Sequence, residues 1–201
     1  LIPIVWLVVT SFSGYKGINT AHFFTQTWSL DNYVALFLRP DSVVQYKKWF
    51  ANTLVIAIFT ALISTIFVLM VAYTMSCMRF KGRKQLMSFG IILNMFPGVL
   101  SMIAVYYILK ALGLAEGSMI RIALIIVFSA GSGVGFYVAK GFFDTIPKAL
   151  DEAAIIDGAT RWQVFTKITA PLSKPIIVYT ILTSFMGPWV DFIFAKANLA
   201  K

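Results

Sequence analysis

Long uncharged stretches alternate with short charged ones along this chain. In four of these stretches Asp, Glu, Lys and Arg are all absent over 16 to 30 consecutive residues. A helix rises about 1.5 Å per residue, so about 20 apolar residues cross the hydrocarbon core of a bilayer. The pattern predicts membrane-spanning helices at approximately residues 50–78, 85–110, 121–140 and 172–192.

The chain begins inside a fifth uncharged stretch, which runs to Tyr15. Fifteen helical residues reach about 22 Å, less than the roughly 30 Å of a hydrocarbon core. We therefore expect residues 1–15 to be the outer part of a first span whose beginning is missing. Residues 16–48 are polar with interspersed Trp and Tyr, and we expect an extracytoplasmic loop with aromatic side chains at the membrane interface.

Basic residues give the predicted helices an orientation. Four Lys and Arg and no acidic residue lie between residues 79 and 84, directly after the second predicted span. Short loops rich in Lys and Arg stay on the cytoplasmic side of a membrane. The chain is then expected to be inside at residues 79–84, outside near Gly113, inside again at Lys140 and outside after its fifth span.

Composition supports a membrane protein. Of the 201 residues, 59% are hydrophobic, whereas a soluble domain averages about 45–50%. The formal net charge of +9 would suggest nucleic-acid binding in a soluble protein. Here the basic residues lie in short loops between apolar stretches, so no nucleic-acid partner is predicted. The fold class that follows is an all-α polytopic membrane protein, in one domain over residues 1–201.

No catalytic or metal-binding constellation is found in the sequence. Cys77 and His22 are each the one residue of their kind, whereas a metal site needs several such ligands. No nucleophile–base pair lies in the predicted spans, and neither glycine-rich nucleotide-binding motif occurs. We expect a chain that is not an enzyme and that binds no metal and no cofactor of its own.

The predicted orientation places a long polar loop, residues 141–171, in the cytoplasm. Pro147 suits the beginning of a helix, and Gly158 can take the left-handed conformation that ends one. Thr160 and Gln163 have the spacing of a capping box for a second helix. The sequence therefore predicts two short helices with interleaved acidic and basic residues. A protein-docking surface and a solvated amphipathic hairpin on the membrane both fit this pattern.

This loop resembles the EAA loop of ABC importer permeases. The positions that carry the likeness are Glu152, Ala153, Ala154, Gly158, Ile168 and Pro171. The flanking residues 146–150, 156–159 and 171–175 are similar to the maltose-type, carbohydrate-uptake branch of that family. Ala170 is one departure, because the family usually has Leu before the proline.

The resemblance implies the transmembrane domain of a type I ABC importer, truncated so that five of six expected spans are visible and the first is partial. It implies that a cytosolic ATPase docks on the loop. The coupling residues would be Glu152, Ala153, Ala154, Asp157 and Gly158. Glu152 would pair with a basic residue of the ATPase, and the two alanines would let the helix seat in a cleft. ATP and Mg²⁺ would be bound by the ATPase.

The same resemblance implies the other partners. They are a homologous second permease, an ATPase dimer, an extracytoplasmic solute-binding protein and an oligosaccharide such as a maltodextrin. The location would be the plasma membrane of a prokaryote, with multiple passes. Other oligosaccharides, polyols or another small solute fit the residues nearly as well.

Three residues of the predicted spans are candidates for the substrate pathway: Asn94, Trp189 and Asp191. Asn94 lies close to Pro97, and a proline within a span can kink the helix. An acidic residue in a membrane is a functional candidate, although one at the boundary can simply reach water. Residues 187–192 are similar to the family's Trp-Asn-Asp/Glu-Phe segment, with Val190 in place of the Asn.

Other functions stay open from the residues alone. A fragment of an ion-coupled secondary transporter would use residues 79–84 as its loop signature. Such a carrier needs a coupling-ion site within the membrane, and the uncharged second, third and fourth spans argue against one. A structural or assembly protein of the membrane would carry no substrate at all.

Overall fold

The structure is a computed structural model, and it describes residues 1–14, 24–25, 27–38, 46–114, 117, 119–131 and 135–191. Within these ranges the regular secondary structure is helical, apart from an isolated antiparallel bridge between Ser13 and Trp28. It divides into two compact units, residues 1–52 and residues 53–201. The predicted all-α fold is therefore observed.

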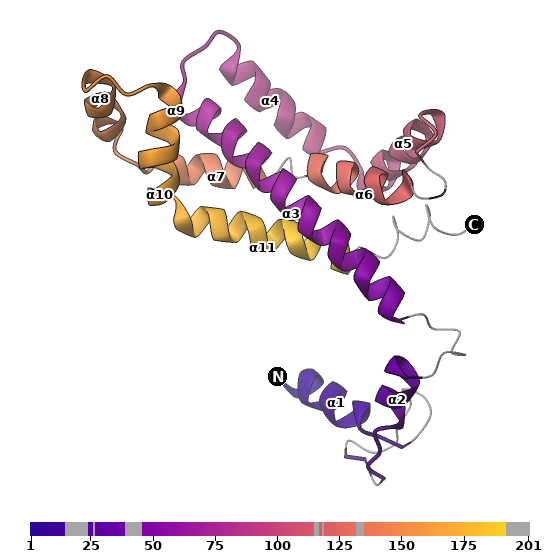
Figure 1. Cartoon of the computed structure of the whole chain (residues 1–201). Helices are drawn as coiled ribbons and strands as arrows, with labels where there is room; N and C mark the ends of the chain where they lie inside the picture. Colours follow the sequence, from indigo (N-terminus) through magenta and orange to yellow (C-terminus); the bar gives the residue numbers. More distant parts are fainter. Residues whose placement is uncertain are drawn as a thin grey trace. The chain divides into compact units, whose positions relative to one another are not determined.

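The first unit contains α1 (Ile2–Ser11) and α2 (Asp31–Phe37) (Figure 1). The side-chain amide of Asn32 donates a 3.2 Å hydrogen bond to the carbonyl oxygen of Ser11. The hydroxyls of Ser11 and Tyr33 lie 2.7 Å apart. These bonds tie the end of α1 to the beginning of α2. Much of the predicted loop 16–48, with His22, lies outside the described residues.

The longest helix is α3 (Tyr46–Cys77), which coincides with the predicted span 50–78. Within the described ranges it is the helix that is long and apolar enough to cross a membrane by itself. The residues that it buries recur every three or four positions, which places them on one face. They include Ala57, Ala61, Ser64, Val68 and Ala72. Small side chains at this spacing let neighbouring helices approach closely.

The predicted span 85–110 is divided between two helices, α4 (Arg83–Asn94) and α5 (Gly98–Ala111). Pro97 stands directly before α5 with φ −57° and ψ 124°. Proline has no N–H to continue the hydrogen-bond ladder of α4, and its ring restricts the residue before it. The sequence predicts a possible kink near Pro97, and the structure has a complete break between two helices there.

The predicted span 121–140 is likewise shared by α6 (Met119–Ala130) and α7 (Gly135–Phe143), at 43° to each other. Gly133 lies outside the described residues. The last long helix is α11 (Lys174–Val190), which is bent by 82° from the helical segment before it. If each bent pair counts as one span, the described residues hold up to three by length and composition. The five-span topology and its orientation stay predictions.

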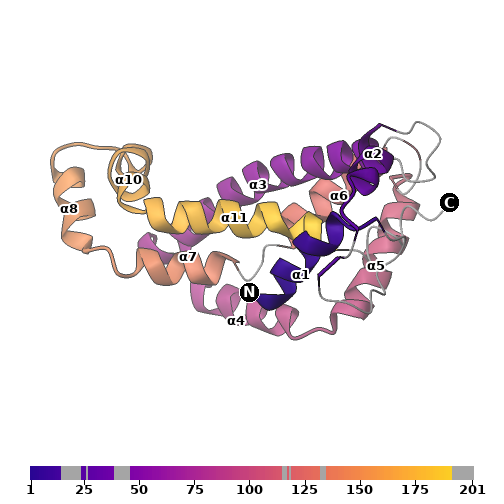
Figure 2. The same ribbon diagram turned by 90° about the horizontal axis from the view of Figure 1, so that it is seen from below.

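Two hydrophobic clusters hold the second unit together. The first joins α3, α7 and α11, which lie side by side in both views (Figure 1, Figure 2). It is built from Val68, Leu69, Ala72, Tyr73, Ala139, Phe143 and Ile176. The second joins α3, α5 and α6 through Ile56, Leu109, Ala123 and Leu124. Both clusters include residues of α3, so this helix is the common support of the unit.

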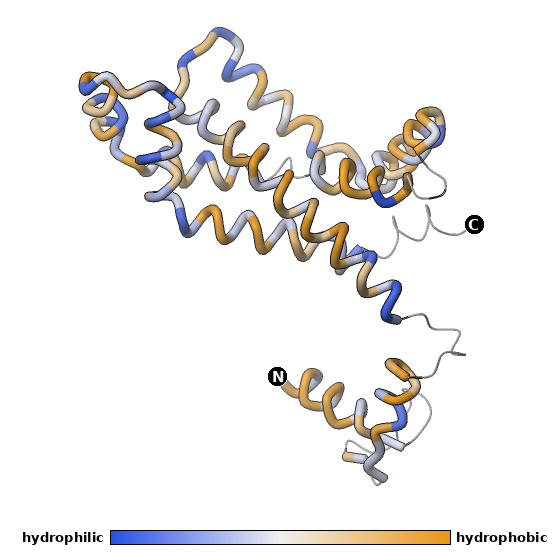
Figure 3. The backbone as a smooth tube through the Cα atoms, in the orientation of Figure 1, coloured by the Kyte–Doolittle hydropathy of each residue, from blue (hydrophilic) through white to orange (hydrophobic). Residues whose placement is uncertain are grey.

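Apolar side chains also cover the outside of the helices. Figure 3 shows hydrophobic positions along most of α3, with hydrophilic ones in the turn before α4 and in the segments that carry the labels α8 and α9 in Figure 1. On α3, Phe59, Leu62 and Phe67 are 50%, 57% and 61% exposed. Contiguous exposed apolar surface of this kind is covered by lipid or by a partner in a functional protein.

Candidate functional site

The predicted loop 141–171 folds as a compact helical knuckle. Its elements are α8 (Lys148–Ile156), α9 (Arg161–Val164), a π-helical turn η2 (Phe165–Thr169) and α10 (Ala170–Leu172). Both views show α8 and α10 at the same end of the second unit, beyond α7 and α11 (Figure 1, Figure 2). The two predicted helices are thus present, with the second continued by a π-helical turn.

Local sequence signals account for the turn between α8 and α9. Gly158 has φ +85°, a left-handed conformation that only glycine adopts readily. The backbone N–H of Gln163 donates to the Thr160 hydroxyl at 3.3 Å, and the N–H of Thr160 donates to the Gln163 side chain at 2.8 Å. The predicted capping box and glycine turn are both confirmed. Pro147 stands at the N-cap position, just before the first turn of α8, and forms no side-chain hydrogen bond to it.

One face of the knuckle points away from the rest of the unit. Of the five predicted coupling residues, Glu152, Ala153, Asp157 and Gly158 are exposed and Ala154 is half-buried. Ile156 is 85% exposed beside them, and Trp162 on α9 is 63% exposed. Within the described ranges Glu152 forms no ion pair. The face combines acidic charge with uncovered apolar surface, which is the chemistry of a protein-docking surface.

The knuckle packs against the last turns of α3 through its π-helical turn η2. The Tyr73 ring packs against Phe165 of η2 with a centroid distance of 4.9 Å, and edge-on against Phe143 at 6.4 Å. Aromatic contacts of this geometry contribute beyond the area they bury. The knuckle is therefore attached to α3 through side-chain contacts as well as through the chain.

A polar contact lies at the beginning of the loop. The Ser76 hydroxyl donates to the Asp144 carboxylate at 2.6 Å, and Lys140 forms an ion pair with the same group. Burial by itself would raise the pKa of Asp144, but the hydrogen bonds from Lys140 and Ser76 hold it below its usual value of 3.8. The charged carboxylate thus joins the end of α3 to the end of α7.

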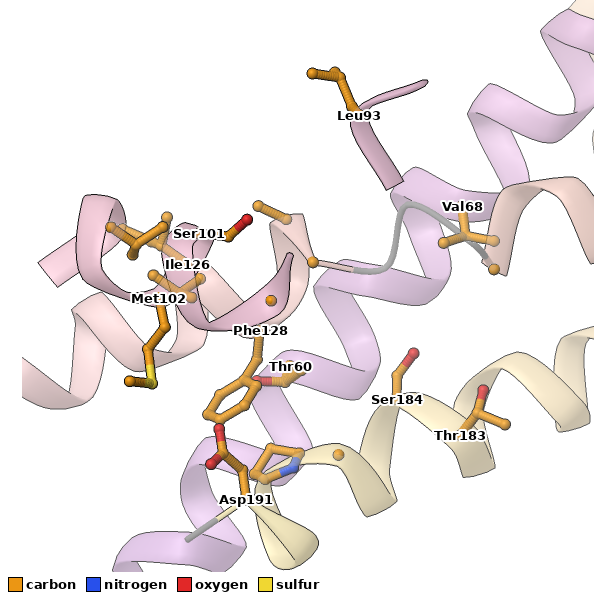
Figure 4. Close-up of a pocket in the computed structure, with 18 of the residues that line it drawn as sticks. Thr60, Val68, Leu93, Ser101, Met102, Ile126, Phe128, Thr183, Ser184 and Asp191 are labelled. Atoms are coloured by element: carbon orange, nitrogen blue, oxygen red, sulfur yellow. The ribbon is translucent and has the colours of Figure 1, made fainter. Parts of the chain in front are cut away.

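The second candidate site is a cavity of about 1480 Å³ within the second unit. Apolar side chains such as Met102, Ile126 and Phe128 form much of its wall (Figure 4). Its polar groups come from α3, α5 and the C-terminal half of α11. They include Thr60, Ser101, Thr183, Ser184 and Asp191. An apolar wall with a few directed polar groups is typical of a small-molecule site.

The three candidates for the substrate pathway differ in whether they line this cavity. Asp191 lines the cavity, with Thr60 and Ser184 on other parts of its wall (Figure 4). Asn94 and Trp189 are not among the described residues that line it. The Asn94 amide donates instead to the carbonyl oxygen of Gly90 in its own helix, at 2.8 Å. None of the three is tested as a substrate contact, so their role stays a prediction.

Sequence reasoning missed the small residues of the cavity, three of which carry a hydroxyl group. Thr180, Thr183, Ser184 and Gly187 all line it. Their spacing of three and four positions puts them on one face of α11. That spacing is the signal that could have found them, because small hydroxyl residues on one face of an apolar helix indicate a helix contact or a polar path.

Comparison with known proteins places the chain among transport proteins. Residues 69–197 match the profile of the family described as binding-protein-dependent transport system inner membrane component. The chain is 34% identical to the maltodextrin transport system permease protein MdxG of Bacillus subtilis (strain 168). The alignment covers 94% of this chain and 67% of MdxG. It is 32% identical to the galactooligosaccharides transport system permease protein GanQ of the same organism. That alignment covers 98% of this chain and 69% of GanQ.

A solved structure shares the fold. It is the crystal structure of a bacterial ABC transporter involved in the import of the acidic polysaccharide alginate, with a TM-score of 0.80. The alignment covers 98% of this chain and 68% of the other, at 24% sequence identity. At that identity the likeness concerns the arrangement of helices, and it confirms the predicted fold class.

Proposed function

Because this chain belongs to the family of binding-protein-dependent transport system inner membrane components, we propose that it forms part of the path by which an ATP-driven importer moves an oligosaccharide across a membrane. Two observations support a sugar as the cargo. The relatives MdxG and GanQ are named for maltodextrins and galactooligosaccharides. The cavity combines hydroxyl groups and one carboxylate with an apolar wall, which suits the hydroxyls and the apolar ring faces of a saccharide.

The size of the cavity supports an oligosaccharide over a single sugar. Pockets for drug-sized molecules have volumes of about 300–1,000 Å³, and this cavity has about 1480 Å³. In our proposal the sugar passes along α11, where Thr183 and Ser184 present their hydroxyls and Asp191 lies at the end of the helix. A homologous permease would complete the wall of the path, in contact with apolar surface that α3 leaves exposed.

The knuckle supports coupling to a separate ATPase, and it is the single observation on which the mechanism depends. Its exposed face holds Glu152 without an ion-pair partner in the described part of the chain, next to the uncovered side chains of Ile156 and Trp162. A basic residue of an ATPase subunit would gain a charge-assisted hydrogen bond there. ATP and Mg²⁺ would be held by that subunit, and an extracytoplasmic binding protein would deliver the sugar.

The chain is a membrane protein, and we place it in the plasma membrane of a prokaryote. In the cycle that we propose, ATP binding draws the ATPase subunits together and displaces the docked knuckle. The displacement tilts the helices to which the knuckle is attached, so that the cavity opens in turn to the two sides of the membrane. This chain contributes no catalytic group to the hydrolysis.

A test of this function purifies the tagged chain together with the subunits that accompany it and reconstitutes the complex in vesicles. We expect an ATPase subunit in the complex and ATP-dependent uptake of maltodextrins that a proton uncoupler leaves unchanged. Glu152→Lys should still insert in the membrane but lose the bound ATPase and the uptake. Asp31→Lys, which reverses a charge at an exposed position of the predicted outer loop, is the control. Normal uptake by Glu152→Lys, or uptake that needs a proton gradient, would overturn the proposal.

A further inference from the structure

The helix α4 takes little part in the packing of the second unit. It buries none of its residues, and neither hydrophobic cluster includes a residue from it. Its half-buried residues are Arg83, Met87 and Gly90. They recur every three or four positions, so they share one face of the helix. The contacts that hold α4 against other helices are therefore expected on this face.

Tyr137 of α7 meets that face. Its hydroxyl donates a hydrogen bond to the backbone carbonyl oxygen of Met87. A carbonyl oxygen has two lone pairs, so Met87 can accept this bond as well as the bond within its own helix. A hydroxyl without a partner in an apolar environment is costly, and here the carbonyl of α4 provides the partner. Within the described ranges, Tyr137 supplies the hydrogen bond that joins α4 to another helix.

Gly90 leaves open the space that the Tyr137 hydroxyl occupies. A Cβ added at Gly90 would lie 2.6 Å from the hydroxyl oxygen, which is closer than Cβ atoms approach other atoms in proteins. The next atoms would be the ring carbon that carries the hydroxyl, at 3.6 Å, and an edge carbon of Phe136, at 3.9 Å. Both are ordinary van der Waals distances. The hydroxyl of Tyr137 is therefore the group that excludes a side chain at position 90.

This contact lies between the knuckle and the cavity. α7 ends at Phe143, shortly before the first helix of the knuckle, so a displacement of the knuckle reaches α7 directly through the chain. α4 extends to the cavity at its other end, where Leu93 and, just after the helix, Phe96 line the wall. Movement of α7 changes that part of the wall only if α4 follows.

We propose that Tyr137 is a positioning residue for coupling: its hydrogen bond to Met87 makes α4 follow α7 when the knuckle is displaced, so that Leu93 and Phe96 move with the rest of the cavity wall. This inference rests on the proposed function and adds to it. Glu152 is the residue that the ATPase holds, and Tyr137 is the residue by which α7 holds α4. Without this bond, ATP hydrolysis would continue while part of the wall stayed behind.

The first test measures the amount of maltodextrin moved per ATP hydrolysed by the reconstituted complex. Tyr137→Phe removes the hydroxyl and keeps the ring. We expect a normal amount of bound ATPase, continued ATP hydrolysis and a transport-to-hydrolysis ratio about fivefold lower, the effect of losing one hydrogen bond. Tyr107→Phe, the same change at a tyrosine that is 64% exposed, should leave the ratio unchanged. A wild-type ratio in Tyr137→Phe would overturn the inference.

A second test asks whether the hydroxyl occupies the space beside Gly90. Gly90→Ala should lower the melting temperature of the wild-type chain in detergent, because the added methyl group displaces the Tyr137 hydroxyl. In the Tyr137→Phe background the same change should leave the melting temperature unchanged or raise it, since the clash is gone and alanine is favoured over glycine within a helix. Gly141→Ala, whose Cβ would meet nothing within 4 Å, should act alike in both backgrounds. Equal effects of Gly90→Ala in the two backgrounds would overturn the contact.

The double variant distinguishes a role in coupling from a role in folding alone. Gly90→Ala with Tyr137→Phe restores packing without the hydrogen bond, so it should melt at least as high as Tyr137→Phe and retain the low transport-to-hydrolysis ratio. Recovery of the wild-type ratio in this variant would show that packing suffices and would overturn the role of the hydroxyl. Failure of the wild-type complex to show ATP-driven uptake would instead overturn the proposed function.

Discussion

Ser76 and Asp144 are separated by 68 positions in the sequence, and the Ser76 hydroxyl donates a 2.6 Å hydrogen bond to the Asp144 carboxylate. The bond joins the last turn of α3 to the residue that follows α7. Lys140, one turn earlier in α7, forms an ion pair with the same carboxylate. The position at which the predicted cytoplasmic loop leaves the bundle is therefore set by a contact between distant segments.

This contact predicts a pH-dependent stability. The pKa of Asp144 in the folded chain is below its usual 3.8, so the charged carboxylate favours the folded state. The contribution is fully present above the usual pKa and is lost as the pH falls through the lower folded pKa. In detergent at pH 7, the melting temperature of Asp144→Asn should therefore be lower than that of the wild type. This difference in melting temperature should disappear in the acidic range below pH 3.8. A difference that is independent of pH would contradict this account.

Ser76→Ala provides a second measurement of the same contact. Loss of one hydrogen bond costs about 1 kcal/mol, which lowers the melting temperature of a chain of this size by about 2–4 °C. Ser88→Ala, which removes the hydroxyl of an exposed serine, is the control for a general effect of this substitution. An unchanged melting temperature in Ser76→Ala would show that the Ser76–Asp144 bond adds nothing to stability.

Substitution of Gly158 and of Gly141 by alanine gives a matched pair of variants that tests the left-handed turn of the knuckle. Both have open space where a Cβ would be added, but only Gly158, with φ +85°, has the left-handed backbone. Gly158→Ala should cost about 1–2 kcal/mol through the backbone alone. Gly141→Ala, within α7, should instead stabilise the chain by roughly 0.5–1 kcal/mol. Thermal melting in detergent distinguishes the two, and equal effects would show that the left-handed turn is not retained.

The cavity on α11 predicts that a bulky residue obstructs transport. Thr183 lines the cavity, whereas its neighbour Leu182 is 57% exposed and is not among the described lining residues. Thr183→Trp should lower maltodextrin uptake on the order of tenfold, equivalent to about 1.4 kcal/mol, because the indole ring would occupy part of the space through which the sugar passes. Leu182→Trp is the control, and the bound ATPase should be normal in both variants. Equal uptake by the two variants would place the pathway elsewhere.

Local chemistry explains why parts of the knuckle could be predicted from the sequence. A capping box needs only Thr160 and Gln163 at the correct spacing, and the left-handed turn needs only Gly158. Both devices act within a few residues and are present as predicted. The exposed position of Glu152 was implied by the likeness to the EAA loop, and the structure leaves that side chain uncovered.

Other features depend on which surfaces meet. The break at Pro97 ends α4 completely, although a proline in an apolar stretch is also compatible with a kinked but continuous helix. Asn94 is a candidate for the substrate pathway because of its place in a predicted span. In the structure its side-chain amide donates a hydrogen bond to the carbonyl oxygen of Gly90 in the same helix. A residue's position along a span does not determine the direction in which its side chain points.

The sequence by itself determined that this chain is helical, that it is a membrane protein and that Glu152 to Gly158 form a short helix and turn, because hydropathy and capping act over short distances. The tertiary structure decided that Ser76 bonds to Asp144 while Glu152 stays exposed, and that α11 lines a cavity with α3 and α5. An apolar helix such as α3 carries hydrophobic residues on every side, so its sequence does not distinguish the face that packs from the face that meets lipid. Only the contacts between distant helices make that distinction.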